Sequence, residues 1–277
     1  MNSVNNQTIR CFDLGGGGLK TALVNYDAEN KTMNVGTIHK MGKCPDQQDI
    51  SDWARQKIKE FNSDLDAEVQ NNYAFGFSLA GLDKLRSKPL STWDVPDLFG
   101  LPREKVTQLH DGNAHLLASL RTMPNLPEGR VWNIALGTGV GFGFTNSKKE
   151  LKPTEDLMKF FGREAWEVKE LTTNKGIWEV GSGPAFDKIM QKHGDKTKAI
   201  EEFAGRWKLF IEKHMIENGK DWGIPNSVVF TGGHTEWNGD LLTNAINSLH
   251  LKVPTFTGPK EAGILGAAYQ SVEGFKI

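Results

Sequence analysis

Residues 13–20, with the sequence DLGGGGLK, combine an aspartate, four consecutive glycines and a lysine. Glycine allows the backbone to approach a polyanion closely and to point N–H groups at it. Asp13, at the end of an apolar run, could hold Mg²⁺ through water, because hard cations prefer carboxylate oxygen. The candidate phosphate contacts in this segment are Gly15, Gly16, Gly17, Gly18 and Lys20. Glycines are also the default residues of turns, so the segment alone fits a flexible hairpin turn equally well.

Two further glycine segments follow along the chain. In ALGTGVGFGF, Gly137 and Gly139 give two positions of close approach, and the Thr138 hydroxyl is a donor suited to phosphate oxygens. VVFTGG ends in Gly232 and Gly233, where the absence of side chains would leave a flat slot for a nucleobase and ribose. Each segment alone fits an ordinary turn. Two glycine hairpins at matching places in two half-patterns nevertheless favour a phosphate cradle.

Asp111 lies between the first two hairpins, in the sequence LHDGNAH, after an expected strand and before an expected helix. An aspartate at such a place is often an ordinary helix N-cap. It could instead be a general base that takes a proton from an acceptor hydroxyl, which contributes about 10²–10⁴-fold to a rate. Phosphoryl transfer otherwise needs positioning, metal and charge neutralisation, for which the glycine segments offer a cradle.

The elements that must position these residues follow from hydrophobic patterning. Helical spacing predicts a helix over residues 50–61, with Asp49 or Ser51 as its N-cap. Gly263 and Gly266, on the closing helix, would permit close helix packing. Alternating strands and helices predict an α/β architecture in two similar halves. We expect hairpins over 9–27 and 130–146, a strand over 32–39, and strands within 71–83, 105–112, 227–233 and 251–258. The further helices are expected over 113–121, 186–192, 198–219, 240–249 and 261–272.

The composition excludes several classes of function. The 277 residues are 38% hydrophobic and 24% charged, which is typical of a globular chain. A net charge of −1 argues against nucleic acid or an anionic membrane as the main partner. Cys11 and Cys44 form no C-x-x-C pair, so neither a disulfide framework nor a structural zinc site is expected. With no apolar signal core and no run of about 18 apolar residues, we expect a cytoplasmic protein.

In their order along the chain, these segments resemble the ROK family of sugar kinases and, more distantly, hexokinases and glucokinases of the actin-like ATPase superfamily. DLGGGGLK matches the family's first phosphate motif, D-x-G-G-T-x-x-K, and LGTGVGFGF matches the second. LHDGNAHLLASL matches the N-D-x-N-A segment, which places the catalytic base on Asp111 and the sugar-contacting asparagine on His110. VVFTGG and EAGILGAA match the adenosine motif and the closing helix, so the resemblance covers nearly the whole chain.

The sequence departs from the family pattern at several places. Gly17 stands where threonine is usual and lacks a hydroxyl for phosphate or metal, an interaction worth roughly 1.5–3 kcal/mol. AWEVKE aligns with the G-E-x-G-H element and gives Glu167 as a sugar contact, with Glu170 in place of histidine. GIWEVGSGPAF places Glu179 on the second sugar-contacting glutamate. The cysteines of the family's zinc element are missing between these two segments, so the resemblance implies a protein without that site.

The resemblance implies an α/β fold of two ribonuclease-H-like domains with a central cleft. The smaller domain would cover residues 1–115, joined by the C-terminal helix at about 262–277, and the larger would cover 116–261. The implied activity is ATP-dependent phosphorylation of a hexose or amino-sugar hydroxyl with Mg²⁺, and a homodimer is compatible with it.

Two alternatives stay open. One is a sugar- or nucleotide-binding protein without transfer activity, which the Gly17 substitution and the missing zinc element favour. The other is a branch of the superfamily that phosphorylates a different acceptor. A DNA-binding repressor is not expected, because a phosphate loop beginning at residue 13 leaves no room for an N-terminal helix-turn-helix.

Overall fold

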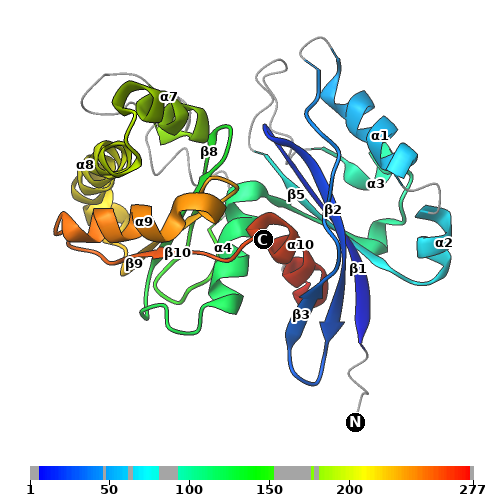
Figure 1. The fold of residues 1–277 in the computed structure, drawn as a ribbon. Coiled ribbons are helices and arrows are strands. Elements are labelled where there is room, and N and C mark those ends of the chain that lie inside the picture. The colour runs from blue at the N-terminus through cyan, green and yellow to red at the C-terminus, as the bar shows by residue number, and fades with distance from the viewer. Residues whose placement is uncertain are drawn as a thin grey trace. The chain divides into compact units, whose positions relative to one another are not determined.

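The computed structural model describes residues 6–45, 48–61, 65–80, 93–152, 176–177 and 181–274. The chain divides into two compact units. The first comprises the residues up to Ala114 together with those from Gly263 onward, and the second is His115–Ala262. Each unit contains one β-sheet with helices packed against it, shown in Figure 1. The prediction of an α/β fold with two sheets is confirmed.

The sheet of the first unit has the strand order β3-β2-β1-β5-β6 in the described residues, with β4 also paired to β2. β1 and β2 form the predicted antiparallel hairpin, whose last pair is Gly15 with Gly18, so that Gly16 and Gly17 form the turn. β5 and β6 run parallel to β1. The strands are β1 (Gln7–Gly15), β2 (Gly18–Asp27), β3 (Thr32–Val35), β4 (His39–Lys40), β5 (Ala74–Leu79) and β6 (Val106–His110).

The strand expected over residues 32–39 is divided into β3 and β4. Both pieces pair with β2, but Val24 pairs with Val35 whereas Thr21 pairs with His39. Between these pairs, two residues of β2 therefore face three residues of the other chain segment, and this one extra residue is the count of a β-bulge. The one-residue slip is the physical reason why a single continuous strand was the wrong prediction here.

Side chains of β1 alternate between the two faces of the sheet, as the pleat of a strand requires. Ile9 and Cys11 pack in a cluster with Ile264 of α10, whereas Phe12 packs in a second cluster with Trp53 of α1. Figure 1 shows α10 on one side of this sheet and α1 and α3 on the other. The helices of this unit are α1 (Ile50–Phe61), α2 (Leu65–Gln70), α3 (Val95–Phe99), the short 3₁₀ helix Arg103–Lys105 and α10 (Ala262–Glu273).

The start of α1 agrees with the sequence. The Asp49 side chain accepts hydrogen bonds from the backbone N–H groups of Ser51 at 2.8 Å and Asp52 at 3.2 Å. Of the two expected caps, Asp49 is therefore the one that satisfies the free N–H groups of the first turn.

The second unit repeats the order of the first with fewer strands. Its sheet has the order β10-β9-β7-β8 in the described part of the chain, with β7 and β8 forming an antiparallel hairpin and β9 and β10 running parallel to β7. The strands are β7 (Val131–Leu136), β8 (Val140–Phe144), β9 (Ser227–Thr231) and β10 (Thr255–Thr257). The helices are α7 (Gly183–His193), α8 (Lys196–Trp222), α9 (Thr235–Ser248) and, from His115 onward, α4 (Asp111–Thr122).

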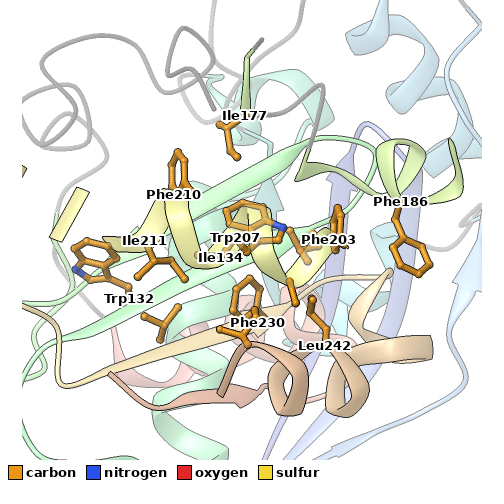
Figure 2. Packing of buried hydrophobic residues seen from close by; sticks show 14 of the residues in the cluster. Trp132, Ile134, Ile177, Phe186, Phe203, Trp207, Phe210, Ile211, Phe230 and Leu242 are labelled. Carbon is orange, nitrogen blue, oxygen red and sulfur yellow. The ribbon is translucent and has the colours of Figure 1, made fainter. Parts of the chain in front are cut away.

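An aromatic core joins this second sheet to α7, α8 and α9. Figure 2 shows Phe203, Trp207 and Phe210 of α8 among side chains of the strands, with Phe186 of α7 beside them. The rings of Trp207 and Phe230 meet edge to face, with their centroids 5.6 Å apart. Burying each such aromatic side chain contributes about 1.5–3 kcal/mol, so this cluster is what fixes the helices on the sheet. None of the helices in the described ranges is long and apolar enough to cross a membrane.

Candidate active site

The polar candidates of the first unit lie at the carboxyl ends of its three parallel strands. Asp13 of β1 is paired with Ser78 of β5, and Leu79 of β5 is paired with His110 at the end of β6. Asp111 follows as the first residue of α4. Because neighbouring strands are about 4.8 Å apart, the two strand steps from β1 to β6 separate Asp13 from Asp111 by about 10 Å. Carboxyl ends of parallel strands are the usual place for ligands in open α/β sheets.

The Asp111 carboxylate is held on one side only. Its Oδ1 accepts a hydrogen bond of 2.7 Å from the N–H of Gly112, and no other described residue donates to either oxygen. An N-cap carboxylate would accept from the N–H two or three residues further on. The side chain is 22% exposed. Asp111 therefore combines a fixed Oδ1 with an Oδ2 that can accept a proton.

His110 lies against Asp111 but is more deeply buried. Its Nδ1 accepts from the Gly112 N–H at 3.2 Å and lies 3.4 Å from Asp111 Oδ1. Only 7% of the His110 side chain is exposed. His110 thus adjoins the candidate base, with little surface left for contact with a ligand.

Two residues from distant parts of the chain contact the Asp13 carboxylate. Ser78 donates from Oγ to Asp13 Oδ1 at 2.8 Å, and Ser78 is fully buried. Gly263 of α10 is also close, because a Cβ added there would lie 2.5 Å from the carboxyl carbon of Asp13. The described residues contain no group of three or more His, Cys, Asp or Glu side chains that could hold a metal ion. Mg²⁺ is usually held by one or two carboxylates together with substrate phosphates, so a lone Asp13 fits such a site.

The glycines of the first hairpin divide into two kinds. Gly18 has a φ of +118°, and a Cβ there would lie 1.9 Å from the carbonyl oxygen of Gly42. The fold therefore demands glycine at position 18. A Cβ on Gly15 would meet no heavy atom within 4 Å, whereas Gly16 and Gly17 are exposed turn residues. Lys20 is paired with Asp13 in the β1–β2 ladder, close to the same strand end.

Three loops of the second unit meet at the carboxyl ends of β7 and β9. The Gly137 carbonyl accepts from the N–H of Gly183, at the start of α7, at 2.8 Å. The Leu136 carbonyl accepts from the N–H of His234, in the loop after β9, at 3.1 Å. A Cβ on Gly232 would lie 2.5 Å from that same Leu136 oxygen. The second and third glycine segments are therefore neighbours, as their placement after adjacent parallel strands requires.

The second unit shows the same division of glycines as the first. Gly232 has a φ of +94° and no room for a side chain, so the fold itself demands glycine there. A Cβ on Gly137, Gly139 or Gly233 would meet nothing within 4 Å, and none of these three has a positive φ. The Thr138 side chain between them is exposed and has no hydrogen-bond partner among the described residues.

A charged cluster attaches α7 to α8. The first residue of α7, Gly183, is the one that donates a hydrogen bond to the Gly137 carbonyl. Glu202 of α8 accepts hydrogen bonds from Lys192 at 2.8 Å, His193 at 2.7 Å and Arg206 at 2.6 Å. The hydrogen bond from Lys192, followed by those from His193 and Arg206, lowers the pKa of Glu202 to about 2. A carboxyl group with a lowered pKa contributes stability that is fully present above its ordinary pKa of 4.5 and is lost as the pH falls from there through about 2. The cluster therefore persists at neutral pH.

The ring of His234, in the loop after β9, packs against α7 and α8. Its imidazole lies edge to face with Phe186 of α7, at 4.7 Å between centroids, and with Phe203 of α8 at 6.0 Å. Burial lowers the pKa of His234, and the nearby charge of Asp187 opposes the shift. The lowered pKa favours the neutral imidazole, whose ring packs against these two phenylalanines.

Some predicted residues cannot be placed, and some that the sequence did not single out now stand beside the site. Glu167 and Glu179 lie outside the residues that the structure describes. Ser78 was part of a quoted strand, but nothing in its local sequence distinguishes it from other buried serines. A place beside the site was likewise not predicted for Gly183 or His234. Gly183 follows Gly181 and Ser182, and His234 directly follows Gly233.

No protein-family model matches the sequence, and no curated protein matches it at a significant level. Solved structures match it over almost its full length. The inorganic polyphosphate/ATP-glucomannokinase from Arthrobacter sp. strain KM has 19% sequence identity and a TM-score of 0.69, over 98% of this chain and 100% of its own. A ROK family glucokinase from Streptomyces griseus, solved with glucose and AMPPNP, has 17% identity and a TM-score of 0.65, over 96% and 100%.

A ROK family transcriptional regulator, a homologue of the E. coli MLC protein, is similar as well. It has 15% identity and a TM-score of 0.62, over 96% of this chain and 78% of its own. Enzymes and a regulator therefore share this architecture, and at such identities the similarity concerns the fold. The chain has a ROK-like sugar kinase fold, as the order of its motifs predicted.

Proposed function

We propose that the protein is an ATP-dependent sugar kinase in which Asp111 is the general base. The observation that carries the proposal is that the fold requires some glycines of these segments and does not require others. Glycine is not required by packing or by φ at Gly15, Gly137, Gly139 and Gly233. Gly15 is the last residue of β1, Gly137 and Gly139 lie in the turn between β7 and β8, and Gly233 lies in the loop after β9. Side chains at these places would be tolerated by the fold. Their absence is explained if a ligand approaches the backbone there.

The residues of the chain would share the work as follows. Asp111 takes the proton of the acceptor hydroxyl on Oδ2, while the Gly112 N–H keeps Oδ1 in place. The hydroxyl oxygen then forms its bond to the transferred phosphorus as the bond to the leaving phosphate oxygen breaks. Backbone N–H groups and the Thr138 hydroxyl would hold phosphate oxygens. Bound Mg·ATP would supply the phosphoryl group and neutralise charge, with Asp13 orienting the metal through water.

The first consequence concerns Gly137. We expect Gly137→Ala to leave the melting temperature unchanged, because the added methyl meets no heavy atom within 4 Å. The same methyl would keep phosphate oxygens away from the backbone. Loss of one hydrogen bond to a charged group corresponds to a rise in KM for ATP of about 10–100-fold. Steady-state kinetics and thermal unfolding on the same sample measure both quantities.

Two matched variants separate the ligand effect from a packing effect. Gly205→Ala, inside α8, also adds a methyl into open space. We expect it to leave the KM for ATP unchanged and not to lower the stability. Gly232→Ala should unfold more easily by about 2–4 kcal/mol, because it combines left-handed strain with overlap of a backbone oxygen. A KM for ATP that stays at the wild-type value in Gly137→Ala would contradict the phosphate role of this loop.

The direct test of the function is ATP consumption across a panel of hexoses, N-acetylhexosamines and polyols. The proposal predicts that at least one sugar raises turnover well above that of Asp111→Asn. A binding protein without transfer activity would instead gain thermal stability from Mg·ATP analogue and sugar, because ligands of the native state stabilise it, but would consume no ATP. Turnover that no sugar raises above the Asp111→Asn background rejects the kinase proposal.

A further inference from the structure

We propose that Ser78 and Gly263 are positioning residues that fix the orientation of the Asp13 carboxylate toward a nucleotide-bound divalent cation. The inference rests on the proposed function, in which Asp13 orients the metal. Neither residue would touch the cation or the reacting atoms. Both residues act through Asp13. Ser78 donates a hydrogen bond to its carboxylate, and Gly263 has no side chain, which allows the backbone of α10 to lie against the carboxylate.

Ser78 determines which oxygen of Asp13 is available. The Ser78 hydroxyl donates to Oδ1 at 2.8 Å, and no described residue donates to Oδ2. The serine is fully buried, and it lies opposite Asp13 in the parallel ladder of β1 and β5. A buried hydroxyl on the adjacent strand cannot easily adopt another rotamer in a packed interior. The hydrogen bond therefore engages Oδ1 and leaves Oδ2 for the cation or its water.

Gly263 of α10 limits the carboxylate by close approach of the helix backbone. A Cβ on Gly263 would lie 2.5 Å from both Cγ and Oδ1 of Asp13 and 2.7 Å from Oδ2. No side chain fits at that position unless the carboxylate moves. Asp13 also lies at the N-terminal end of the twelve-residue helix α10, where the helix dipole favours a negative charge. The approach of α10 therefore holds the carboxylate both sterically and electrostatically.

The helix that carries Gly263 is itself held closely against the sheet and α4. A Cβ on Gly76 of β5 would lie 2.5 Å from the Ala267 carbonyl oxygen, and a Cβ on Gly266 would lie 1.8 Å from that of Ala114. Ser271 adds a hydrogen bond of 2.6 Å to Thr107 of β6. With α10 placed by three elements, the position of Gly263 is determined independently of Asp13. The α10 backbone at Gly263 can therefore limit the movement of the Asp13 carboxylate.

The test is the affinity for Mn²⁺ in the presence of ATP, measured by electron paramagnetic resonance, together with the KM for Mg²⁺ and kcat. We expect Ser78→Ala to weaken Mn²⁺ binding roughly tenfold or more, because partners of metal-holding carboxylates typically affect metal affinity by 10–100-fold. Ser78→Thr keeps the hydroxyl and should recover most of the affinity. Gly263→Ala should weaken Mn²⁺ binding in the same direction, with a lower melting temperature.

The control is Thr21→Val, in the same sheet. Thr21 is fully buried, and its hydroxyl donates to the Cys11 carbonyl oxygen at 2.9 Å, away from Asp13. We expect Thr21→Val to lower stability without changing the Mn²⁺ affinity. If Ser78→Ala lacks the circular dichroism spectrum of the wild type, Ser78→Cys replaces it, because cysteine keeps one heavy atom at the γ position, although a larger one, and its S–H is a weaker donor.

The outcomes separate this inference from the proposed function. Wild-type Mn²⁺ affinity in Ser78→Ala, or an equal loss in Thr21→Val, overturns the positioning role while the kinase proposal stands. A wild type that binds Mn²⁺·ATP but consumes no ATP with any sugar rejects the kinase proposal, and the variant series still decides the role of Ser78. A wild type that binds no Mn²⁺ with ATP overturns the positioning role as well.

Discussion

Asp111→Asn should lower kcat by about 10²–10⁴-fold, the contribution typical of a general base. Asparagine has the same size and keeps a carbonyl oxygen that can accept from the Gly112 N–H, so the start of α4 should be unchanged. It cannot take up the proton of an acceptor hydroxyl. We therefore expect KM values for ATP and sugar close to those of the wild type, with the loss confined to kcat. Steady-state kinetics with the best sugar of the panel measures this division.

The matched control for Asp111→Asn is Asp97→Asn. Asp97 of α3 belongs to the same unit, is 71% exposed and forms a salt bridge of 2.8 Å with Arg103. This variant removes one carboxylate charge in α3 and not at the strand ends that carry Asp13 and Asp111, so kcat should not change. A kcat for Asp111→Asn within about tenfold of the wild type would be too small a loss for a general base. Asp111 would then be a binding or structural residue.

The sequence allowed the positions of the glycine segments and Asp111 to be predicted because their signals are local. A run of apolar residues, a glycine turn and a second apolar run define a hairpin within about twenty residues, and β1–β2 and β7–β8 formed as expected. Parallel strands with intervening helices then place the ends of β1, β5 and β6 at one edge of a sheet. That the candidate side chains gather at strand ends was therefore predictable from their order alone.

The partners that hold these residues could not be predicted in the same way. Ser78 meets Asp13 across 65 residues, and Gly263 meets it from the other end of the chain. The sequence suggested that Gly263 and Gly266 permit close helix packing. Gly266 does pack against the backbone of α4, at Ala114, whereas Gly263 packs against the carboxylate of Asp13. Helical spacing shows which glycines share a face of α10, but the group facing each glycine depends on the register between distant elements.

The same limit applies to telling functional glycines from structural ones. The four glycines at positions 15–18 are equivalent in the sequence, but Gly18 is demanded by a positive φ and by the carbonyl of Gly42, whereas Gly15 is not. That carbonyl lies next to β4, after the bulge that the sequence did not predict. A close approach of two backbones depends on such details of register. Only the folded chain therefore separates Gly15 from Gly18.

Glu68→Ala should destabilise the first unit by about 3–5 kcal/mol, the usual loss when one partner of a buried ion pair is removed. The Arg10 and Glu68 side chains are only 9% and 10% exposed, and Arg10 Nε lies 3.2 Å from Oε1 and 3.3 Å from Oε2 of the carboxylate. The substitution leaves the guanidinium buried without this carboxylate. Urea unfolding measures the change, with the midpoint followed separately for each unit if two transitions occur.

A surface pair and a double variant show whether burial is the cause. Lys57 and Glu60 form an ion pair of 2.6 Å on α1, and Glu60 is 49% exposed, so Glu60→Ala should produce no measurable change. Replacing both buried partners, as Arg10→Met with Glu68→Leu, should recover part of the loss, because apolar side chains need no compensating charge. Equal destabilisation by Glu68→Ala and Glu60→Ala would contradict the role of burial.

The buried pair also provides a stability change that should leave catalysis intact. Arg10 and Asp13 both belong to β1, but side chains three positions apart on a strand point to opposite faces. Arg10 meets Glu68 of α2, whereas Asp13 meets Gly263 of α10. Below its unfolding transition, Glu68→Ala should therefore retain the Mn²⁺ affinity and kcat of the wild type, while Ser78→Ala should lose Mn²⁺ affinity with a smaller change in stability. If both variants lost affinity and stability in the same proportion, the Asp13 site would depend on the general stability of the sheet instead of on the particular contacts that hold its carboxylate.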